Sequence, residues 1–394
     1  MRKSAFVLAM LLASAGAQAA SKSKSAPALP PPLPEESIPA VATLPADYPA
    51  SWIMVQDFHF NAIVDGRIAI VDTADEKLPL KGLVRAAQFA NMLYAPDRHE
   101  IYTSETFYSR LTRGERTDAI TFWDTATLQP KGEIVLPGGK RQQSVTYTGL
   151  FRFTNHGKWA LVANFTPAQS VTVVDLEGRK VLGDIDLPGC AHIYPTGERG
   201  FASLCTDGSM ISITLDEKGG VQSSQSIPGV QDIDHQPLFG MPAMVGTTAW
   251  FVSYHGELHG IDLSGTVAKP LAKTASVGTA EGGTPEWRPG GWQVIASDKS
   301  GLLYVLMSPL GKEGSHKDGG SEVWVVDPVK NERVRRIDLA GQAGSISVTH
   351  EAVPHLIAAR ADGNIDVFDA TTGQPVRHLG ATAAFNPIVM EPAG

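Results

Sequence analysis

Short apolar segments that close on an aspartate recur along the chain from about residue 52 onward. Each segment has alternating or continuous hydrophobic residues followed by a polar turn, and the seven segments end at Asp72, Asp124, Asp175, Asp216, Asp262, Asp327 and Asp369. Successive aspartates lie 41 to 65 residues apart. A period of about 50 residues holds four strands of about 5 to 6 residues with their turns, which is the size of one propeller blade.

The residues around each aspartate predict the strands of such a blade. In segments 124–138, 175–189 and 327–341 the aspartate opens a turn, and a second strand follows that ends in Leu-Pro-Gly or Leu-Ala-Gly. These hairpins are typical of the two outer strands. The apolar segments 157–165, 301–308 and 355–362 are predicted as inner strands that neighbouring blades bury on both faces.

The fold class that follows is all-β, a seven-bladed β-propeller over residues 52–394. Outside the N-terminal segment, no window carries apolar residues at the 3, 4, 7 spacing over three turns, which argues against a helical bundle. The strand at 52–58 is expected to complete the last blade and close the ring, since closure protects the sheet edges. The longest gap between aspartates predicts a surface insertion around 275–286.

The first 51 residues differ in character from the repeats. Met1-Arg2-Lys3, an apolar stretch and Ala17-Gln18-Ala19 predict a secretory signal peptide over 1–19, too short to span a bilayer, and hence export to the periplasm. Residues 20–51 are rich in proline and are predicted as an arm, either a flexible spacer or a segment that orders on a partner subunit.

Composition narrows the range of partners. The formal net charge is −8, a sign that repels phosphate backbones and argues against nucleic acid. Gly and Pro number 39 and 27, which agrees with many short elements joined by tight turns.

Cys190 and Cys205 are the two cysteines of the chain, and the midpoint between them falls in the turn Thr196–Gly200. A hairpin folded at that turn brings the two residues opposite each other, with Cβ atoms within about 5.5 Å. In an oxidising compartment they are expected to form a disulfide worth about 3 kcal/mol by the chain-entropy model. The alternative, a redox-active pair, lacks CxxC spacing or a helix N-terminus.

Motifs for catalysis on this chain are missing. His255 and His259 have the i, i+4 spacing of a zinc helix, but the surrounding segment predicts strand, turn and strand. His235 and His316 are predicted as isolated loop residues. No P-loop, GxSxG elbow or CxxCH haem motif occurs. We therefore expect no catalytic, cofactor-binding or metal-ligating residue on this chain.

Four segments together resemble the heavy, or large, subunit of the quinoprotein amine dehydrogenases, the methylamine and aromatic amine dehydrogenase family. They are FYSRLTRGERTD (107–118), DLPGCAHIYPTGERGFASLCTDGSM (186–210), WRPGGWQ (287–293) and KEGSHKDGGSEVWVVD (312–327). The similarity runs from about residue 52 to the end. It implies a periplasmic seven-bladed propeller that pairs two-and-two with a small, or light, subunit.

The resemblance also implies that the two subunits have different roles in the reaction. Tryptophan tryptophylquinone, built from two tryptophans of the small subunit, oxidises primary amines to aldehyde and ammonia, and a blue-copper protein such as amicyanin or azurin accepts the electrons. The large subunit walls the substrate channel and excludes water. Phe60 matches the phenylalanine at the channel mouth of the methylamine-specific members, although the following turn differs in length. The alternative for Phe60 is an ordinary core aromatic.

The subgroup and two other functions stay open at this point. Segments 145–159 and 311–317 are closer to the aromatic amine enzyme, which we favour, whereas WRPGGWQ and DLPGC are closer to the methylamine enzyme. The paired cysteines match the family's large-subunit disulfide. The alternatives are a stand-alone periplasmic propeller that binds a ligand or scaffolds a partner, and a propeller enzyme with a metal or soluble quinone on its axis.

Overall fold

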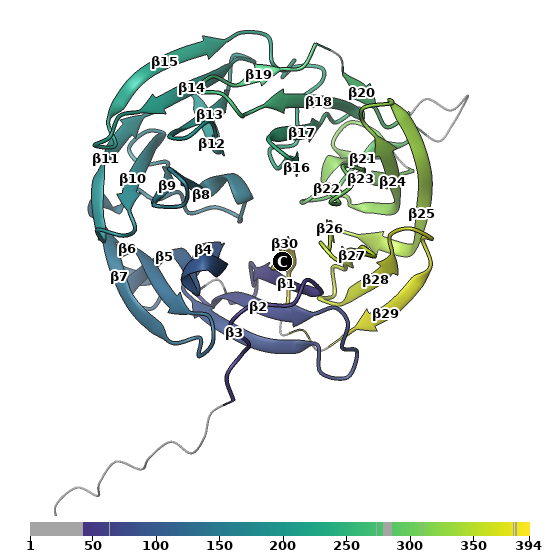
Figure 1. Cartoon of the computed structure of the whole chain (residues 1–394), viewed down its shortest axis with the longest axis horizontal. Coiled ribbons are helices and arrows are strands. Elements are labelled where there is room, and N and C mark those ends of the chain that lie inside the picture. The colour runs from purple at the N-terminus through teal and green to yellow at the C-terminus, as the bar shows by residue number, and fades with distance from the viewer. Residues whose placement is uncertain are drawn as a thin grey trace, which may run out of the picture. The chain divides into compact units, whose positions relative to one another are not determined.

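The computed structural model describes residues 42–62, 64–272, 274–278, 286–309, 311–380, 382 and 384–394. Seven antiparallel sheets stand in a ring around a central axis, which confirms the predicted seven-bladed β-propeller (Figure 1). The compact unit extends from Ala42 to Gly394. Over the described residues there is no α-helix, and the 3-10 turns are η1 (Pro96–Arg98), η2 (Pro137–Gly139), η3 (Thr148–Leu150) and η4 (Ser315–Lys317).

Each blade is an up-and-down sheet whose strands follow one another from the axis outward. Blade 1 contains, from the inside, β30 (Pro387–Pro392), β1 (Trp52–Asp57), β2 (Gly66–Asp72) and β3 (Leu80–Ala86). Blade 2 contains β4 (Gln88–Ala95), β5 (Glu100–Arg110), β6 (Arg113–Asp124) and β7 (Pro130–Leu136). Blade 3 contains β8 (Phe151–Thr154), β9 (Trp159–Asn164), β10 (Ser170–Asp175) and β11 (Lys180–Asp186). Blade 4 contains β12 (Cys190–Pro195), β13 (Gly200–Cys205), β14 (Met210–Leu215) and β15 (Val221–Ile227).

The next two blades have five strands because one position in each sheet is interrupted. Blade 5 contains β16 (Ala243–Val245), β17 (Thr248–Val252), β18 (Glu257–Asp262) and an outer position shared by β19 (Lys269–Pro270) and β20 (Ala275–Ser276). Blade 6 contains an inner position shared by β21 (Arg288–Pro289) and β22 (Ile295–Ser297), then β23 (Leu303–Ser308), β24 (Gly320–Asp327) and β25 (Glu332–Ala343). Blade 7 contains β26 (Ser345–Val348), β27 (His355–Ala359), β28 (Ile365–Asp369) and β29 (Pro375–Leu379).

The ring closes because the two ends of the chain share blade 1. β1 pairs with β2 on one side and with the C-terminal β30 on the other. The prediction that the strand at 52–58 closes the ring is therefore confirmed. The prediction that this strand completes the last blade is wrong. Blade 7 has its four strands from consecutive sequence, and β30 instead supplies the innermost strand of blade 1.

The seven repeated aspartates stabilise the turns that lead to the outermost strand of each blade. The Asp124 carboxylate accepts hydrogen bonds from the backbone N–H groups of Ala126 and Thr127, and that of Asp327 accepts from Val329 and Lys330. The other five aspartates accept backbone N–H groups in the same way. These bonds lower the pKa of Asp124 and Asp327. The turn chemistry inferred from the sequence is confirmed.

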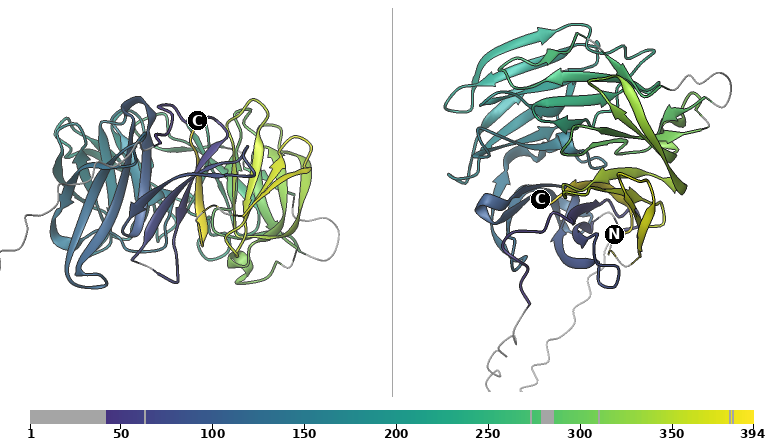
Figure 2. Two further views of the ribbon diagram at one scale, coloured as in Figure 1. Left: turned by 90° about the horizontal axis from the view of Figure 1, so that it is seen from below. Right: turned by 45° about the vertical axis from the view of Figure 1, so that its right-hand side comes forward.

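The alternating strand directions give the ring two distinct faces (Figure 2). The turn face carries the aspartate turns. The opposite face, here called the cavity face, carries the loops between the second and third strands of each blade and the loops that lead to the next blade. The strands second from the axis, β9, β23 and β27, are almost fully buried between blades, as predicted.

The N-terminal predictions are tested only in part. The signal peptide at 1–19 and residues 20–41 lie outside the described residues. Residues 42–51 pack on the turn face, where the Tyr48 hydroxyl donates to the Thr125 carbonyl at 2.6 Å and the Leu44 N–H donates to Ala126 at 2.9 Å. Most of the predicted insertion, 279–285, also lies outside the described residues, and Ala275–Ser276 pairs with β18.

Candidate functional site

A cavity of about 470 Å³ opens on the cavity face, at the end of the central axis. Blades 3 to 6 supply its lining, chiefly through aromatic side chains and through the strand that begins at Cys190. Its aromatic and imidazole residues are Tyr147, His192, Phe239, Tyr254, Trp292 and His316. Lys317 is the charged residue of the described lining, which contains no aspartate or glutamate. The cavity is thus shaped for apolar and aromatic groups rather than for acid–base chemistry of its own.

The interruption of the innermost strand of blade 6 builds one wall of this cavity. Between β21 and β22 the chain turns inward, and the Trp292 N–H donates to the Gly344 carbonyl at 2.7 Å. A Cβ atom on Gly291, whose φ is 136°, would lie 2.6 Å from that carbonyl oxygen. Glycine at 291 therefore allows the close approach that carries Trp292 to the axis.

Trp292 is held across the axis by blade 3. Its indole N–H donates to the Thr146 carbonyl at 2.8 Å, and its ring centroid lies 4.6 Å from that of Tyr147. Tyr147 in turn lies 4.9 Å from the imidazole of His192. On the other side of the cavity, Tyr254 stacks on His316 at 4.4 Å. These aromatic and imidazole side chains of the wall are therefore held by ring-to-ring contacts.

His192 projects into the cavity from a β-bulge. The pairing of β12 with β13 shifts between Ala191 and Tyr194, and His192 adopts a φ of 65°. The Ser203 hydroxyl donates to the His192 carbonyl at 2.6 Å, which holds the bulge. A bulge re-aims a side chain that a regular strand would point elsewhere.

The imidazole of His192 is neutral and makes no side-chain hydrogen bond to the described residues. Burial lowers its pKa to about 4. Its Nδ1 is buried without a hydrogen-bond partner among the described residues, and the Nε2 side of the ring faces Gly240. A neutral imidazole has one donor and one acceptor nitrogen, so with Nδ1 buried it is Nε2 that could bond to a group in the cavity.

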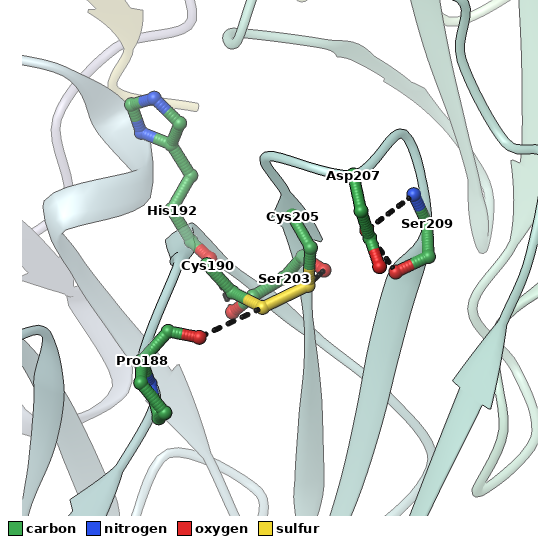
Figure 3. The surroundings of a disulfide bond; sticks show 7 residues. All are labelled: Pro188, Cys190, His192, Ser203, Cys205, Asp207 and Ser209. Carbon is green, nitrogen blue, oxygen red and sulfur yellow. Dashed lines mark hydrogen bonds between the residues drawn. A yellow bond between two sulfur atoms is a disulfide. The ribbon is translucent and has the colours of Figure 1, made fainter.

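The predicted disulfide lies beside this bulge. Cys190 and Cys205 are directly opposite in the register of β12 and β13, and they are bonded. Both residues line the cavity, and the His192 ring points away from the sulfur atoms (Figure 3). The hairpin derived from the sequence is therefore confirmed, and it supports the bulge that carries His192.

Phe60 lies on the same face in the loop between β1 and β2. Its side chain is 54% exposed, so it is not the core aromatic of the alternative interpretation. The Phe60 N–H donates to the Asn386 side-chain oxygen at 2.9 Å, and the buried Asp57 carboxylate accepts from the Asn386 N–H at 2.8 Å. The Phe60 ring packs 4.1 Å from that of Phe58. The structure fixes its backbone but leaves the ring available for a partner.

Exposed phenylalanines gather on this one face. Over the described residues, the large exposed hydrophobic side chains include four phenylalanines, all in loops or strand ends of the cavity face: Phe60, Phe107, Phe165 and Phe385. Phe107 belongs to the β5–β6 hairpin, whose strands of 11 and 12 residues are longer than most in the molecule. Exposed aromatic side chains on one face are typical of a protein–protein interface.

A second hollow of about 510 Å³ follows the axis toward the turn face. Arg152 and Glu391 form an ion pair across it at 3.1 Å. Thr148 and Gln293 line this hollow, whereas their chain neighbours Tyr147 and Trp292 line the cavity. The two hollows therefore adjoin each other at this level of the axis.

The histidines that the sequence analysis considered as possible metal ligands do not come together in the structure. His259 lies on β18 beside Glu257, and His255 lies in the preceding turn beside Glu286, so they face different glutamates. His235 pairs with Asp232 in a loop. Within the described ranges, no group of three or more His, Cys, Asp or Glu residues is placed to hold a metal ion.

His316, predicted as a loop residue rather than a ligand, lies in the 3-10 turn η4, and the structure adds that it stacks on Tyr254 in the cavity wall. Sequence reasoning missed Tyr147, His192 and Trp292 as cavity residues. His192 and Trp292 stand within the quoted segments 186–210 and 287–293. The only available signal was thus the family resemblance, because the residues come from different blades.

Solved structures share this fold. A dihydro-heme d1 dehydrogenase, NirN, superposes with a TM-score of 0.52 at 15% identity, covering 88% of this chain and 76% of that one. A putative 6-phosphogluconolactonase from Bacteroides fragilis gives a TM-score of 0.56 at 13% identity, covering 86% and 98%. At such identity the likeness shows the fold alone. The molecule is a β-propeller with an aromatic cavity and an exposed aromatic face at one end of its axis.

The sequence comparisons define its family. Residues 50–390 match the family model of the methylamine dehydrogenase heavy chain. The methylamine dehydrogenase heavy chain of Methylophilus methylotrophus is 30% identical over 330 residues, covering 82% of this chain and 78% of the relative. That of Methylorubrum extorquens is 30% identical over 342 residues, covering 84% and 80%. The chain belongs to the methylamine dehydrogenase heavy chain family, as the resemblance indicated, and is a large subunit of an amine dehydrogenase.

Proposed function

We propose that this chain is the large subunit, without a quinone of its own, of a periplasmic amine dehydrogenase with two heavy and two light chains. The complex oxidises primary amines to aldehyde and ammonia and passes electrons to a blue-copper protein such as amicyanin or azurin. Tryptophan tryptophylquinone on the light chain would supply the carbonyl that accepts the amine's electrons. No helix among the described residues is long and apolar enough to cross a membrane.

The observation that carries this proposal is the combination of family membership with one face that bears exposed aromatic side chains and a cavity lined almost without charged residues. A quinone on a partner needs walls that exclude water and add no competing acid or base. The cavity lining has aromatic rings and a single charged residue, Lys317. The four exposed phenylalanines lie in loops or strand ends of the same face. This is the face on which we place the light chain.

Phe60 is the residue that we assign to the mouth of the substrate channel. Its backbone is held by Asn386, and its ring is about half exposed beside Phe58. An aromatic ring that is fixed at its base and free at its edge restricts which amine passes without taking part in the chemistry. The preference for an aromatic amine remains a prediction, and the relatives named above are methylamine dehydrogenase heavy chains.

Expression with and without a light-chain gene tests the proposal. The heavy chain co-expressed with the light chain should give a complex that absorbs visible light, bleaches on addition of amine and oxidises methylamine, phenylethylamine or tyramine. The lone heavy chain should be inactive. Amine oxidation by the lone chain, or a stable chain that takes up no light chain, would contradict the proposal.

A further inference from the structure

The cavity on the cavity face is a preformed receptor with a polar point in its wall. Its volume of about 470 Å³ lies in the range of specific binding pockets. Ring contacts between Tyr147, Trp292 and His192 at 4.6 and 4.9 Å fix one side, and the disulfide fixes the start of β12. The shape therefore exists before any partner arrives.

The chemistry of the wall selects the occupant. Flat apolar rings favour an aromatic group, because aromatic pairs add to the energy of area burial. The Nδ1 of His192 is buried out of an occupant's reach, but its Nε2 has no hydrogen-bond partner among the described residues, so the occupant should carry a polar edge that bonds to Nε2. The cavity has no carboxylate to neutralise a cation, and Lys317 would repel one. A neutral aromatic side chain with a hydroxyl or an indole N–H meets all three conditions.

The position of the cavity selects the source of that side chain. Its opening is on the face that bears Phe60, Phe107, Phe165 and Phe385, to which we assigned the light chain. Interface hot spots are enriched in tyrosine and tryptophan that fill pockets on the partner. We propose that the cavity receives a tyrosine or tryptophan side chain of the light chain, whose polar edge bonds to His192. This inference rests on the proposed function of the chain.

Small-molecule probes test the receptor on the lone, full-length heavy chain. p-Cresol and toluene have similar shapes and differ by the hydroxyl. p-Cresol should bind saturably and about tenfold more tightly than toluene, as measured by calorimetry. In His192→Phe, which keeps a ring of similar size, the two probes should bind alike. Equal binding of both probes to the unaltered chain would overturn the role of His192.

Filling the cavity tests its occupant. Ala191 is exposed and lines the cavity, so Ala191→Trp places an indole in it with little strain on the core. This variant should bind the light chain at least about tenfold more weakly. The matched control is Ala74→Trp, at an exposed turn of the opposite face, which should bind normally. Melting temperatures of the two variants should match that of the unaltered chain.

Failure of this inference is distinguishable from failure of the proposed function. If the unaltered chain forms an active complex and Ala191→Trp assembles with the same affinity, only the inference is overturned. The same holds if p-cresol binds the assembled complex as tightly as it binds the lone chain, because the cavity is then still open. If the unaltered chain takes up no light chain, the proposed function itself fails.

Discussion

Trp292 and Tyr147 come from blades 6 and 3, on different sides of the ring, and their rings meet at 4.6 Å on the axis. The Trp292 indole N–H also donates to the carbonyl of Thr146. This contact lies between the cavity, which Tyr147 and Trp292 line, and the second hollow, which their chain neighbours Thr148 and Gln293 line. The interrupted innermost strand of blade 6 thus supplies a wall of the cavity.

Gly291→Ala should disturb this contact. The new Cβ would stand 2.6 Å from the Gly344 carbonyl oxygen, at a φ of 136° that alanine rarely adopts. We expect a loss of about 1–3 kcal/mol in unfolding free energy, measured by urea denaturation, and a change in tryptophan fluorescence. Gly344→Ala is the matched control, because open space surrounds a Cβ there. Equal losses in the two variants would contradict this account.

Removing the disulfide should destabilise the chain without abolishing the fold. The Cys190–Cys205 bond closes a loop of 15 residues. Cys190→Ala with Cys205→Ala should lose about 3 kcal/mol of unfolding free energy by the chain-entropy model. Denaturation of the unaltered chain under reducing conditions provides the control, and it should give the same loss. No difference between oxidised and reduced chains would refute the prediction.

His192 should make stability depend on pH. Burial lowers its pKa from 6.5 to about 4 in the folded chain. Between these values the unfolded chain binds more protons, so stability is full above pH 6.5 and falls as the pH drops toward 4. We expect this residue to account for a loss on the order of 2 kcal/mol between pH 7 and 4.5.

His192→Phe should therefore have a flatter stability curve than the unaltered chain over that window. Urea denaturation at both pH values measures the difference. Tyr147→Phe is the control, since it keeps the ring beside His192 and should preserve the slope. An unchanged slope in His192→Phe would show that the imidazole is not held neutral by the fold.

Phe60→Ala should change amine preference rather than stability. Because the side chain is about half exposed, the unfolding free energy should change by less than about 1 kcal/mol. In the assembled enzyme, the ratio of kcat/KM for phenylethylamine to that for methylamine should shift about five- to tenfold. Phe165→Ala, an equally exposed phenylalanine of the same face, should leave the ratio unchanged. If both variants shift it alike, Phe60 has no special place at the channel.

Much of the fold was determined by the sequence because its signals are local. Each repeated aspartate bonds to backbone groups within four residues, so the turns can be read directly from the chain. Cys190 and Cys205 lie at equal distances in sequence on either side of one turn, and this spacing likewise predicted that they face each other on neighbouring strands. Ring closure was only partly predictable, because nothing local shows that β30 joins blade 1 rather than blade 7.

The cavity was decided by the tertiary structure alone. Tyr147, His192, Tyr254 and Trp292 lie on four different blades and have no common spacing in sequence. They meet because seven closed blades bring loops that are distant in the chain to one axis, where backbone contacts at Gly291 and the bulge at His192 direct the side chains. Hydrogen bonds within a turn depend on residues that are close in the sequence, whereas contacts across the ring form only after the seven blades have closed it.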